Sequence, residues 1–334
     1  MYISTFPIHY VKSLLRSATA SGLNADALLR FAKIDPKMLD DDGARVSQVC
    51  ISRLFRAIAS RVNSESLGFE THQPPLGSFA MMCNATLQSD TLGHALSKMQ
   101  MFYVMFPLAT QIDFSQGEDY SYFEIKKSEG IIDPDHLYME LGLAIFHRYA
   151  QWLIDQPIPL ARVEFAFPKP PYSLEFVAVF SASAVFSAEH TRLVLPSESM
   201  SAPIVQDKKS MKLFLKAAPL SFLTEPEFDR SITAKVRRLI QGTIEREEEI
   251  VEMDELSAEL HYTPATLRRK LQQEQTSYRK IKDDVRRDIA ITLLEGRQLS
   301  LENIAIKLGF LDSSSFYRAF KRWTGTQPRS FLSD

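Results

Sequence analysis

The chain has 334 residues, 45% of them hydrophobic, which suffices for two domains of ordinary size and argues against wholesale disorder. Its net charge is only −2, but residues 268–334 hold 14 Lys and Arg against 8 Asp and Glu, whereas residues 1–228 hold 20 against 24. The apolar runs are too short to span a membrane, no secretory leader is visible, and two cysteines are too few for a disulfide framework. We therefore expect a cytoplasmic protein with reduced, buried thiols.

The first part of the chain shows helical periodicity. Apolar residues recur at spacings of three and four through residues 6–63, the pattern of amphipathic helices. Asn24 stands before "ADALLRFA" and Thr91 before "LGHALSKMQMFYVMF", and both are residue types that cap helix N-termini. We expect helices to begin at both positions.

Strand signals follow. "TQIDF" and "YSYFEIKK" are joined by the turn-forming "SQGED", and "ARVEFAFP", "LEFVAVF", "AVFSA" and "TRLVLP" also read as strands. A long helix is expected to begin at Asp133, with Pro134 in its first turn, and another lies near "IVQDKKSMKLFLKA". The sequence thus predicts a mixed α/β (α+β) N-terminal domain over residues 1–217, with parallel and antiparallel pairing both open. A proline-containing linker is predicted at 218–228.

No strand signal remains after Phe228, so residues 229–334 are predicted to be all-α. "DELSAELHYTPATLRRKLQQEQTSY" and "ENIAIKLGFLDSSSFYRAFKRWTGTQP" share one layout, in which a short apolar helix meets a tight turn and a second helix follows. Between them "YRKIKDDVRRDIAITLLEG" forms one helix, about 25 Å long. This layout predicts helix-turn-helix units at about 253–274 and 301–324, joined by a long helix.

The second unit carries the clearest signals. Gly309 stands where its first helix must end in a left-handed turn, and Asp312 can cap its second helix. Phe316, Phe320 and Trp323 recur at helical spacing and should form a buried stripe. The side chains around the rest of that helix could enter the major groove and contact base edges or phosphates. The predicted DNA-binding residues here are Ser313, Ser314, Tyr317, Arg318, Lys321 and Arg322.

The first unit is similar but departs from this pattern. Thr263 can cap its second helix and Pro264 suits the first helical position. His261 stands at the turn position that Gly309 occupies in the second unit, and histidine tolerates positive φ better than most residues. The predicted DNA-binding residues of this unit are Ala265, Thr266, Arg268 and Arg269.

The segment "SLENIAIKLGFLDSSSFYRAFKRWTGTQPRSF" closely resembles the signature of the AraC/XylS family of transcription regulators, and the likeness extends more loosely back to Asp229. The resemblance implies two helix-turn-helix subdomains that bind double-stranded DNA. His261, and Gln275 where the second half has Gly325, depart from the family pattern, so the first unit is expected mainly to position the protein.

The N-terminal domain has a resemblance of its own. "ESLGFETHQPPLGSFAMMCNATLQSDTLGHAL" is similar to the arabinose-binding-type sensor domain of the subgroup that includes ornithine-utilisation and virulence regulators. This likeness implies a small-molecule effector of unknown identity and pairing of protomers into a homodimer. The acidic run "EREEEI" is either exposed helix surface or a contact, for example with RNA polymerase.

Methionine and aromatic side chains adapt to apolar ligands, but they are also common in ordinary cores. The candidate effector-pocket residues are Met81, Met82, Phe102, Tyr103 and Phe106.

Metal and cofactor signals are weak. His136, Glu140 and His147 share one face of the expected helix, but no further ligand motif accompanies them. Phosphate-cradling glycine loops, "HExxH" and "GxSxG" are missing as well. We predict no cofactor, metal or catalytic residue.

These observations favour a sequence-specific DNA-binding transcription regulator, an activator that responds to an effector in its N-terminal domain. Control by a protein partner remains an alternative, which a tightly packed N-terminal domain would favour over one with a cavity. An enzyme fused to a DNA-binding module is the least favoured reading.

Overall fold

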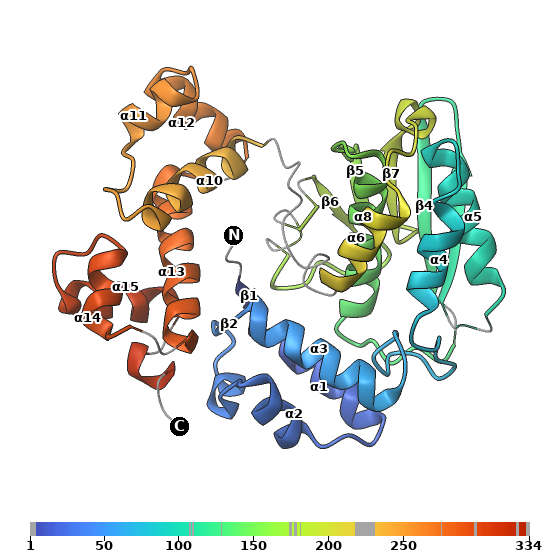
Figure 1. The fold of residues 1–334 in the computed structure, drawn as a ribbon, viewed down its shortest axis with the longest axis horizontal. Coiled ribbons are helices and arrows are strands. Elements are labelled where there is room, and N and C mark those ends of the chain that lie inside the picture. The colour runs from blue at the N-terminus through green and yellow to red at the C-terminus, as the bar shows by residue number, and fades with distance from the viewer. Residues whose placement is uncertain are drawn as a thin grey trace. The chain divides into compact units, whose positions relative to one another are not determined.

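The computed structural model describes residues 5–106, 108, 110–127, 129–173, 176, 179–180, 182–217, 231–274, 276–296, 299–324 and 327–331. Apart from the gaps between these ranges, one compact unit comprises residues 10–32 and 52–217, and a second comprises 5–9, 33–51 and 231–331 (Figure 1). The predicted linker, 218–228, lies outside the described residues, and the predicted domain boundaries at 217 and 229 remain predictions.

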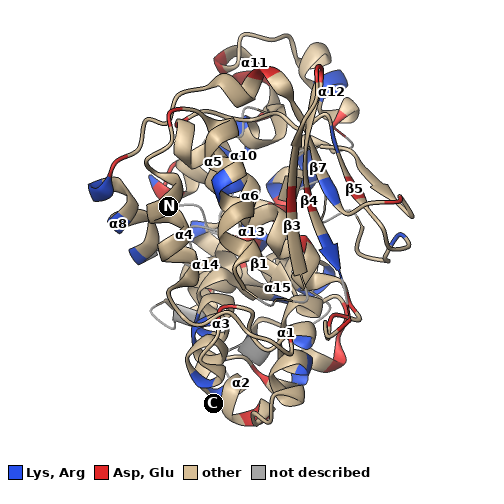
Figure 2. Cartoon of the chain, turned by 90° about the vertical axis from the view of Figure 1, so that its right-hand side faces the viewer, with Lys and Arg blue, Asp and Glu red and all other residues tan. Residues whose placement is uncertain are grey.

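A five-stranded mixed sheet organises the N-terminal unit. Its order is β3-β4-β7-β5-β6, and the first four of these strands lie side by side in Figure 2. All neighbouring pairs are antiparallel except β5 and β6, which are parallel. The strands are β3 (Thr110–Gln116), β4 (Tyr120–Lys127), β5 (Arg162–Phe165), β6 (Ala184–Phe186) and β7 (Arg192–Pro196).

Five of the six predicted strand segments are thereby confirmed. The prediction for "LEFVAVF" is wrong where it can be compared, because Phe176, Val179 and Phe180 are helical, and the rest of that segment lies outside the described residues. These three phenylalanine and valine side chains pack onto the core cluster of the unit, so burial rather than strand propensity explains their apolar character.

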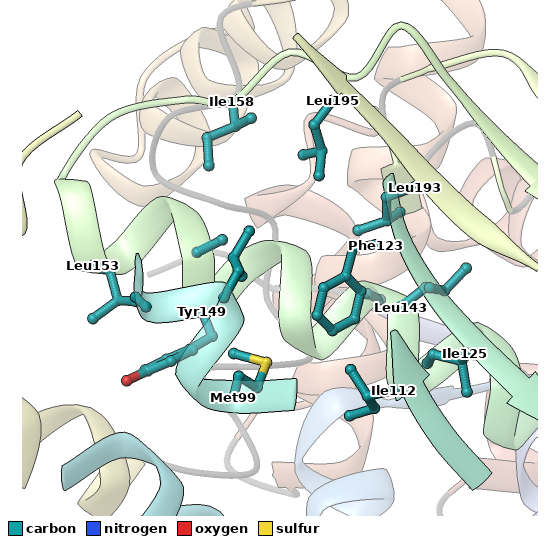
Figure 3. Packing of buried hydrophobic residues seen from close by; sticks show 14 of the residues in the cluster. Met99, Ile112, Phe123, Ile125, Leu143, Tyr149, Leu153, Ile158, Leu193 and Leu195 are labelled. Atoms are coloured by element: carbon teal, nitrogen blue, oxygen red, sulfur yellow. The ribbon is translucent and has the colours of Figure 1, made fainter. Parts of the chain in front are cut away.

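The helices of this unit are α1 (Ile8–Ala20), α2 (Ala25–Ala32), α3 (Gln48–Val62), α4 (Ser78–Thr86), α5 (Leu92–Val104), α6 (Leu137–Ile154) and α8 (Lys208–Ala217). The first residues of α1, up to His9, and of α3, up to Ile51, belong to the second unit. The 3-10 turn η2 (Ser197–Ser201) follows β7. Met99 of α5 and Leu143 of α6 meet Phe123 of β4 in a buried apolar cluster (Figure 3). The core of this unit therefore lies between α5, α6 and the sheet.

The helix starts follow from capping chemistry. The side chain of Asn24 accepts a hydrogen bond from the Ala27 amide at 2.8 Å, and Thr91 caps α5, so both predicted caps are confirmed. α6 begins at Leu137, not at Asp133 as predicted, because His136 adopts a left-handed conformation with φ of 60°. Asp133 still caps this helix from a distance, since its carboxylate accepts from the amides of Tyr138 and Met139.

The C-terminal unit is helical except for one small sheet. Its helices are α10 (Ile232–Glu245), α11 (Met253–Glu259), α12 (Pro264–Gln273), α13 (Tyr278–Gly296), α14 (Leu301–Lys307) and α15 (Ser313–Thr324), and its 3-10 turns are η1 (Pro36–Asp40) and η3 (Pro328–Phe331). Ile281, Val285 and Ile289 of α13 belong to a buried apolar cluster that includes side chains of α10, α11, α12, α14 and α15. The predicted long connecting helix therefore forms the centre of one core.

Residues 5–9 and 33–51 also belong to this unit. They contain β1 (Thr5–Pro7) and β2 (Arg45–Ser47), which pair antiparallel. The prediction of helix throughout 6–63 is therefore wrong at these strands. Strands of three residues are too short to show alternation, and their pairing joins segments about 40 positions apart.

A buried carboxylate connects this small sheet to α13. Asp288 is only 4% exposed, and it accepts from the Thr5 hydroxyl at 2.5 Å and from Arg237 at 3.3 Å. Arg45 in turn donates to the Thr5 hydroxyl at 2.9 Å, and Arg287 donates to Asp288 at 3.0 Å. Burial raises the pKa of Asp288, but Arg287, Arg237, Arg45 and the Thr5 hydroxyl outweigh it, so that the pKa lies below its ordinary value.

We predict that Asp288→Asn lowers the free energy of unfolding by about 3–5 kcal/mol at neutral pH, since the partly buried Arg237 and Arg287 lose the buried charge with which they pair. Because the folded-state pKa is depressed, this contribution is present above the unfolded pKa of about 3.9 and is lost as the pH falls through the folded value. Urea unfolding at a series of pH values measures it, with the exposed Glu259→Gln as the control. An equal loss at every pH would contradict the assignment.

Candidate nucleic-acid interface and effector cavity

The turn between α14 and α15 is fixed by backbone geometry. Gly309 has φ of 71°, as predicted for a left-handed helix end. The guanidinium of Arg286 donates to the Gly309 carbonyl at 3.2 Å and lies 4.8 Å from the centroid of the Phe310 ring. The connecting helix α13 thereby holds the turn directly.

α15 separates apolar from polar side chains. Its cap is Asp312, which accepts from the Ser315 amide at 2.7 Å, and Phe316 and Phe320 are both 0% exposed. Trp323 packs against the same core but is half-buried, so the predicted buried stripe is confirmed at Phe316 and Phe320.

The predicted DNA-binding residues of α15 differ in accessibility. Ser314, Arg318, Lys321 and Arg322 are exposed, whereas Ser313 is half-buried. Tyr317 is also half-buried, packs against the core, and accepts a hydrogen bond from Arg329 at 3.2 Å. The four exposed side chains are therefore the ones that a duplex could reach without rearrangement.

The first helix-turn-helix unit has the same construction. His261 occupies the turn with φ of 59°, so it adopts the conformation that the sequence required of it. Thr263 caps α12 by accepting from the Thr266 amide, and Pro264 is the first helical residue. Ala265, Arg268 and Arg269 are exposed and Thr266 is half-buried. In the ribbon of Figure 2, α12 is coloured for basic residues and the preceding α11 for acidic ones. The Gln275 comparison lies outside the described residues.

A polar groove of about 420 Å³ runs between α13 and α15. Its walls include Arg318 and Arg322, together with Ser315 and three cations of α13 that the sequence reading missed: Arg279, Lys282 and Arg286. Lys282 pairs with Glu252 at 2.5 Å and Arg322 lies 3.4 Å from Asp283, so part of this charge is already balanced. The spacing of three and four between the α13 cations was visible in the sequence and could have identified this face.

The N-terminal unit contains an apolar cavity of about 380 Å³. Its walls come from α3, α4, α5, α6, α8, β3, β4 and the segment between α3 and α4. Besides two tyrosines, the polar residues in the lining are Glu65, Thr110 and the exposed Arg56. Glu65 accepts from the amides of Gly77 and Phe79 at 2.8 and 2.7 Å, and burial raises its pKa despite these bonds. The rings in the lining are Phe55, Phe79, Tyr103, Tyr138 and Phe146.

The predicted effector-pocket residues are not brought together here. Tyr103 lines the cavity, and it lines an adjoining hollow with Phe106. Met81 is 65% exposed, while Met82 and Phe102 are buried in the core cluster, so the structure does not place these three in the cavity lining. Adjacent residues of a helix point in different directions, which explains the contrast between Met81 and Met82.

The residues considered as metal ligands or reactive thiols are engaged in ordinary packing and hydrogen bonds. His136 stacks on Phe167, and Glu140 accepts a hydrogen bond from Tyr10. His147 is bonded to the Ile158 carbonyl, and burial lowers its pKa to about 4. The thiols of Cys50 and Cys83 are buried, as expected.

Within the described part of the chain no cluster of three or more His, Cys, Asp and Glu side chains could hold a metal ion. Over the same residues, no helix combines the length and hydropathy needed to cross a bilayer.

The two units together define a DNA-binding regulator with an attached ligand-binding-type domain. Residues 22–204 match the family model described as the arabinose-binding domain of AraC transcription regulator, N-terminal, and residues 256–334 match a helix-turn-helix domain. The chain therefore belongs to the AraC family of transcription regulators.

The chain is also similar to individual proteins, to different extents. The ornithine utilization regulator of Pseudomonas aeruginosa is 27% identical over 326 residues, covering 97% of this chain and 95% of the relative. The regulator VqsM of the same organism is 38% identical over 72 residues, or 22% of each chain. The crystal structure of CdpR from P. aeruginosa covers 92% of this chain and 96% of its own, with 23% identity and a TM-score of 0.34.

We predict that Gly309→Ala destabilises the C-terminal unit by about 1–2 kcal/mol, because an L-residue is strained at positive φ. Its Cβ would also lie 3.2 Å from the Arg286 guanidinium. Gly242→Ala is the matched control: it lies inside α10, meets only the flexible end of Arg246, and should stabilise by about 0.5–1 kcal/mol. Chemical denaturation of both variants measures these values, and equal effects at the two glycines would refute the role of the turn.

Proposed function

We propose that this regulator is a sequence-specific transcription activator that reads DNA with α15 and α12 and responds to a small molecule bound in the N-terminal cavity. The DNA-reading part of the proposal rests on one observation, the separation of apolar from polar side chains around α15. Its aromatic stripe is buried, so Ser314, Arg318, Lys321 and Arg322 face outward from one side of a short helix. A cationic helix of this kind fits the major groove.

The roles within this surface follow from side-chain reach. Ser314 is small and lies in the first turn of α15, where it allows close approach to the duplex. Arg318, one turn further along, has the fork of donors that suits guanine or a phosphate. Arg268 and Arg269 on α12 and Arg279 in the α13 groove suit phosphate oxygens, which position a protein on DNA without selecting sequence.

The N-terminal cavity supports control by a small molecule rather than by a protein partner. Its 380 Å³ falls within the range of about 300–1,000 Å³ that is typical of ligand pockets. An effector would act by binding one arrangement of the regulator more tightly than another, which shifts the population toward the form competent for DNA.

Homodimer formation is part of the proposal. Met101, Val104 and Met105, at the end of α5, are 69, 72 and 69% exposed, and such apolar surface is suited to pairing protomers.

Because the regulator binds DNA, the proposal places it in the cytoplasm. Activation of transcription further requires RNA polymerase as a partner. Within the acidic run, Glu247 already pairs with Lys307 at 2.7 Å and Glu248 with Arg246 at 2.8 Å. These two carboxylates are therefore engaged within the C-terminal unit, and the run as a whole gives little support to a polymerase contact.

Arg318→Ala tests the DNA-binding surface. If Arg318 reads a base, binding to a preferred DNA site should weaken by about 1–3 kcal/mol, with the loss concentrated at one position of the site. Fluorescence anisotropy against single-base variants of a site selected from random DNA measures this at fixed salt. Arg246→Ala is the control, since Arg246 is exposed, follows α10, and lies on neither reading helix. Equal loss on every DNA sequence would assign Arg318 to a phosphate, and no loss would remove it from the interface.

A further inference from the structure

The charged side chains at the N-terminal cavity that are not exposed to solvent are both acidic. Among its lining residues the charged side chains are Glu65 and Arg56, and Arg56 is an exposed residue of α3. Behind the lining lies a second acid, Glu70, which is 1% exposed and accepts hydrogen bonds from Thr110 and, at 3.0 Å, from Tyr138. Both donors line the cavity. Two carboxylates beside this apolar space, against one exposed arginine at its edge, favour positive over negative charge inside it.

Two tyrosine hydroxyls lie near the same carboxylates. Burial raises the pKa of Tyr103, and the charges of Glu65 and Glu70 raise it further. Burial also raises the pKa of Tyr138, followed by the charge of Glu70. A negative group placed in this space would be opposed by the same charges, and a positive group would be stabilised.

Aromatic rings form much of the remaining wall. Tyr103 and Phe146 meet edge to face with centroids 5.7 Å apart, and Phe55, Phe79 and Tyr138 supply further rings. The faces of aromatic rings carry partial negative charge and attract cations, most strongly where water is excluded. Glu65 can accept another donor, because a carboxylate has about four lone-pair sites and the two amide bonds of Glu65 use two of them.

We propose that the cavity binds an organic monocation: an ammonium group on an apolar body of roughly 10–15 non-hydrogen atoms, since the cavity has the volume of about a dozen waters. The ammonium lies beside Glu65, and the apolar body lies among the rings. The inference rests on the proposal that this cavity is the effector site.

Three probes of one shape test the charge preference. Phenylbutylamine, phenylbutanol and phenylbutyrate share the same apolar body and differ at one end, and their affinities for the full-length protein can be measured by calorimetry at neutral pH. The amine should bind about tenfold tighter than the alcohol, and the carboxylate should bind weakest. Equal affinities, tighter binding of the alcohol or carboxylate, or no binding of the amine at millimolar concentration would each overturn the proposal.

Two pairs of variants then test which residues cause the preference for the amine over the alcohol. Glu65→Gln should bring the affinity for the amine close to that for the alcohol and leave the alcohol unchanged, whereas Glu118→Gln, in an exposed loop, should change neither. Ala80→Phe, which fills the cavity, should abolish binding of all probes, while Met81→Phe, its exposed neighbour on α4, should not. An unchanged amine preference in Glu65→Gln would contradict the proposal.

Glu65 also caps α4, so the Glu65→Gln variant could lose its fold. If its thermal unfolding shows this loss, a second variant, Tyr103→Leu, takes its place. Tyr103→Leu removes a ring of the cavity wall and should weaken the amine more than the alcohol, and equal weakening would contradict the proposal. These titrations contain no DNA, so their failure is separate from any failure of DNA binding or of effector control.

Discussion

The C-terminal unit depends on the burial of two phenylalanines of α15. Phe316 and Phe320 are fully enclosed among side chains from the other helices of this unit, and each such ring stabilises the fold by about 1.5–3 kcal/mol relative to exposure. They are four residues apart and so lie on the same side of the helix. Packing that side inward leaves Arg318 and Arg322 outward. The orientation of the proposed DNA-reading surface is therefore a consequence of the core.

The N-terminal unit combines a packed core with a hollow beside it. Its sheet and helices α5 and α6 enclose a dry core, yet a hollow of about 380 Å³ is left beside that core. The proposed effector site rests on this hollow and on the acidic groups at its edge. Core and cavity share Tyr103, whose ring packs against Phe102 and Phe146.

Local chemistry could be predicted from the sequence, and contacts between distant segments could not. Gly309, Asp312, Thr263 and the aromatic stripe were predicted because each depends on neighbours within a few positions. The pairing of β1 with β2 was missed because it joins short, distant segments. The cavity was missed for the same reason: Phe55, Ile125 and Leu215 meet in its wall although the sequence separates them widely. Methionine content predicted a pocket among residues that mostly proved to be core or surface.

The central claim is that α12 and α15 both face one duplex. Hydroxyl-radical footprinting of the protein on a DNA site selected from a random pool tests it most directly. Two reading helices joined by α13 should protect two tracts on the same side of the duplex, about 10 base pairs apart. Protection of one tract only, tracts on opposite sides, or failure to select any sequence from the pool would contradict the claim.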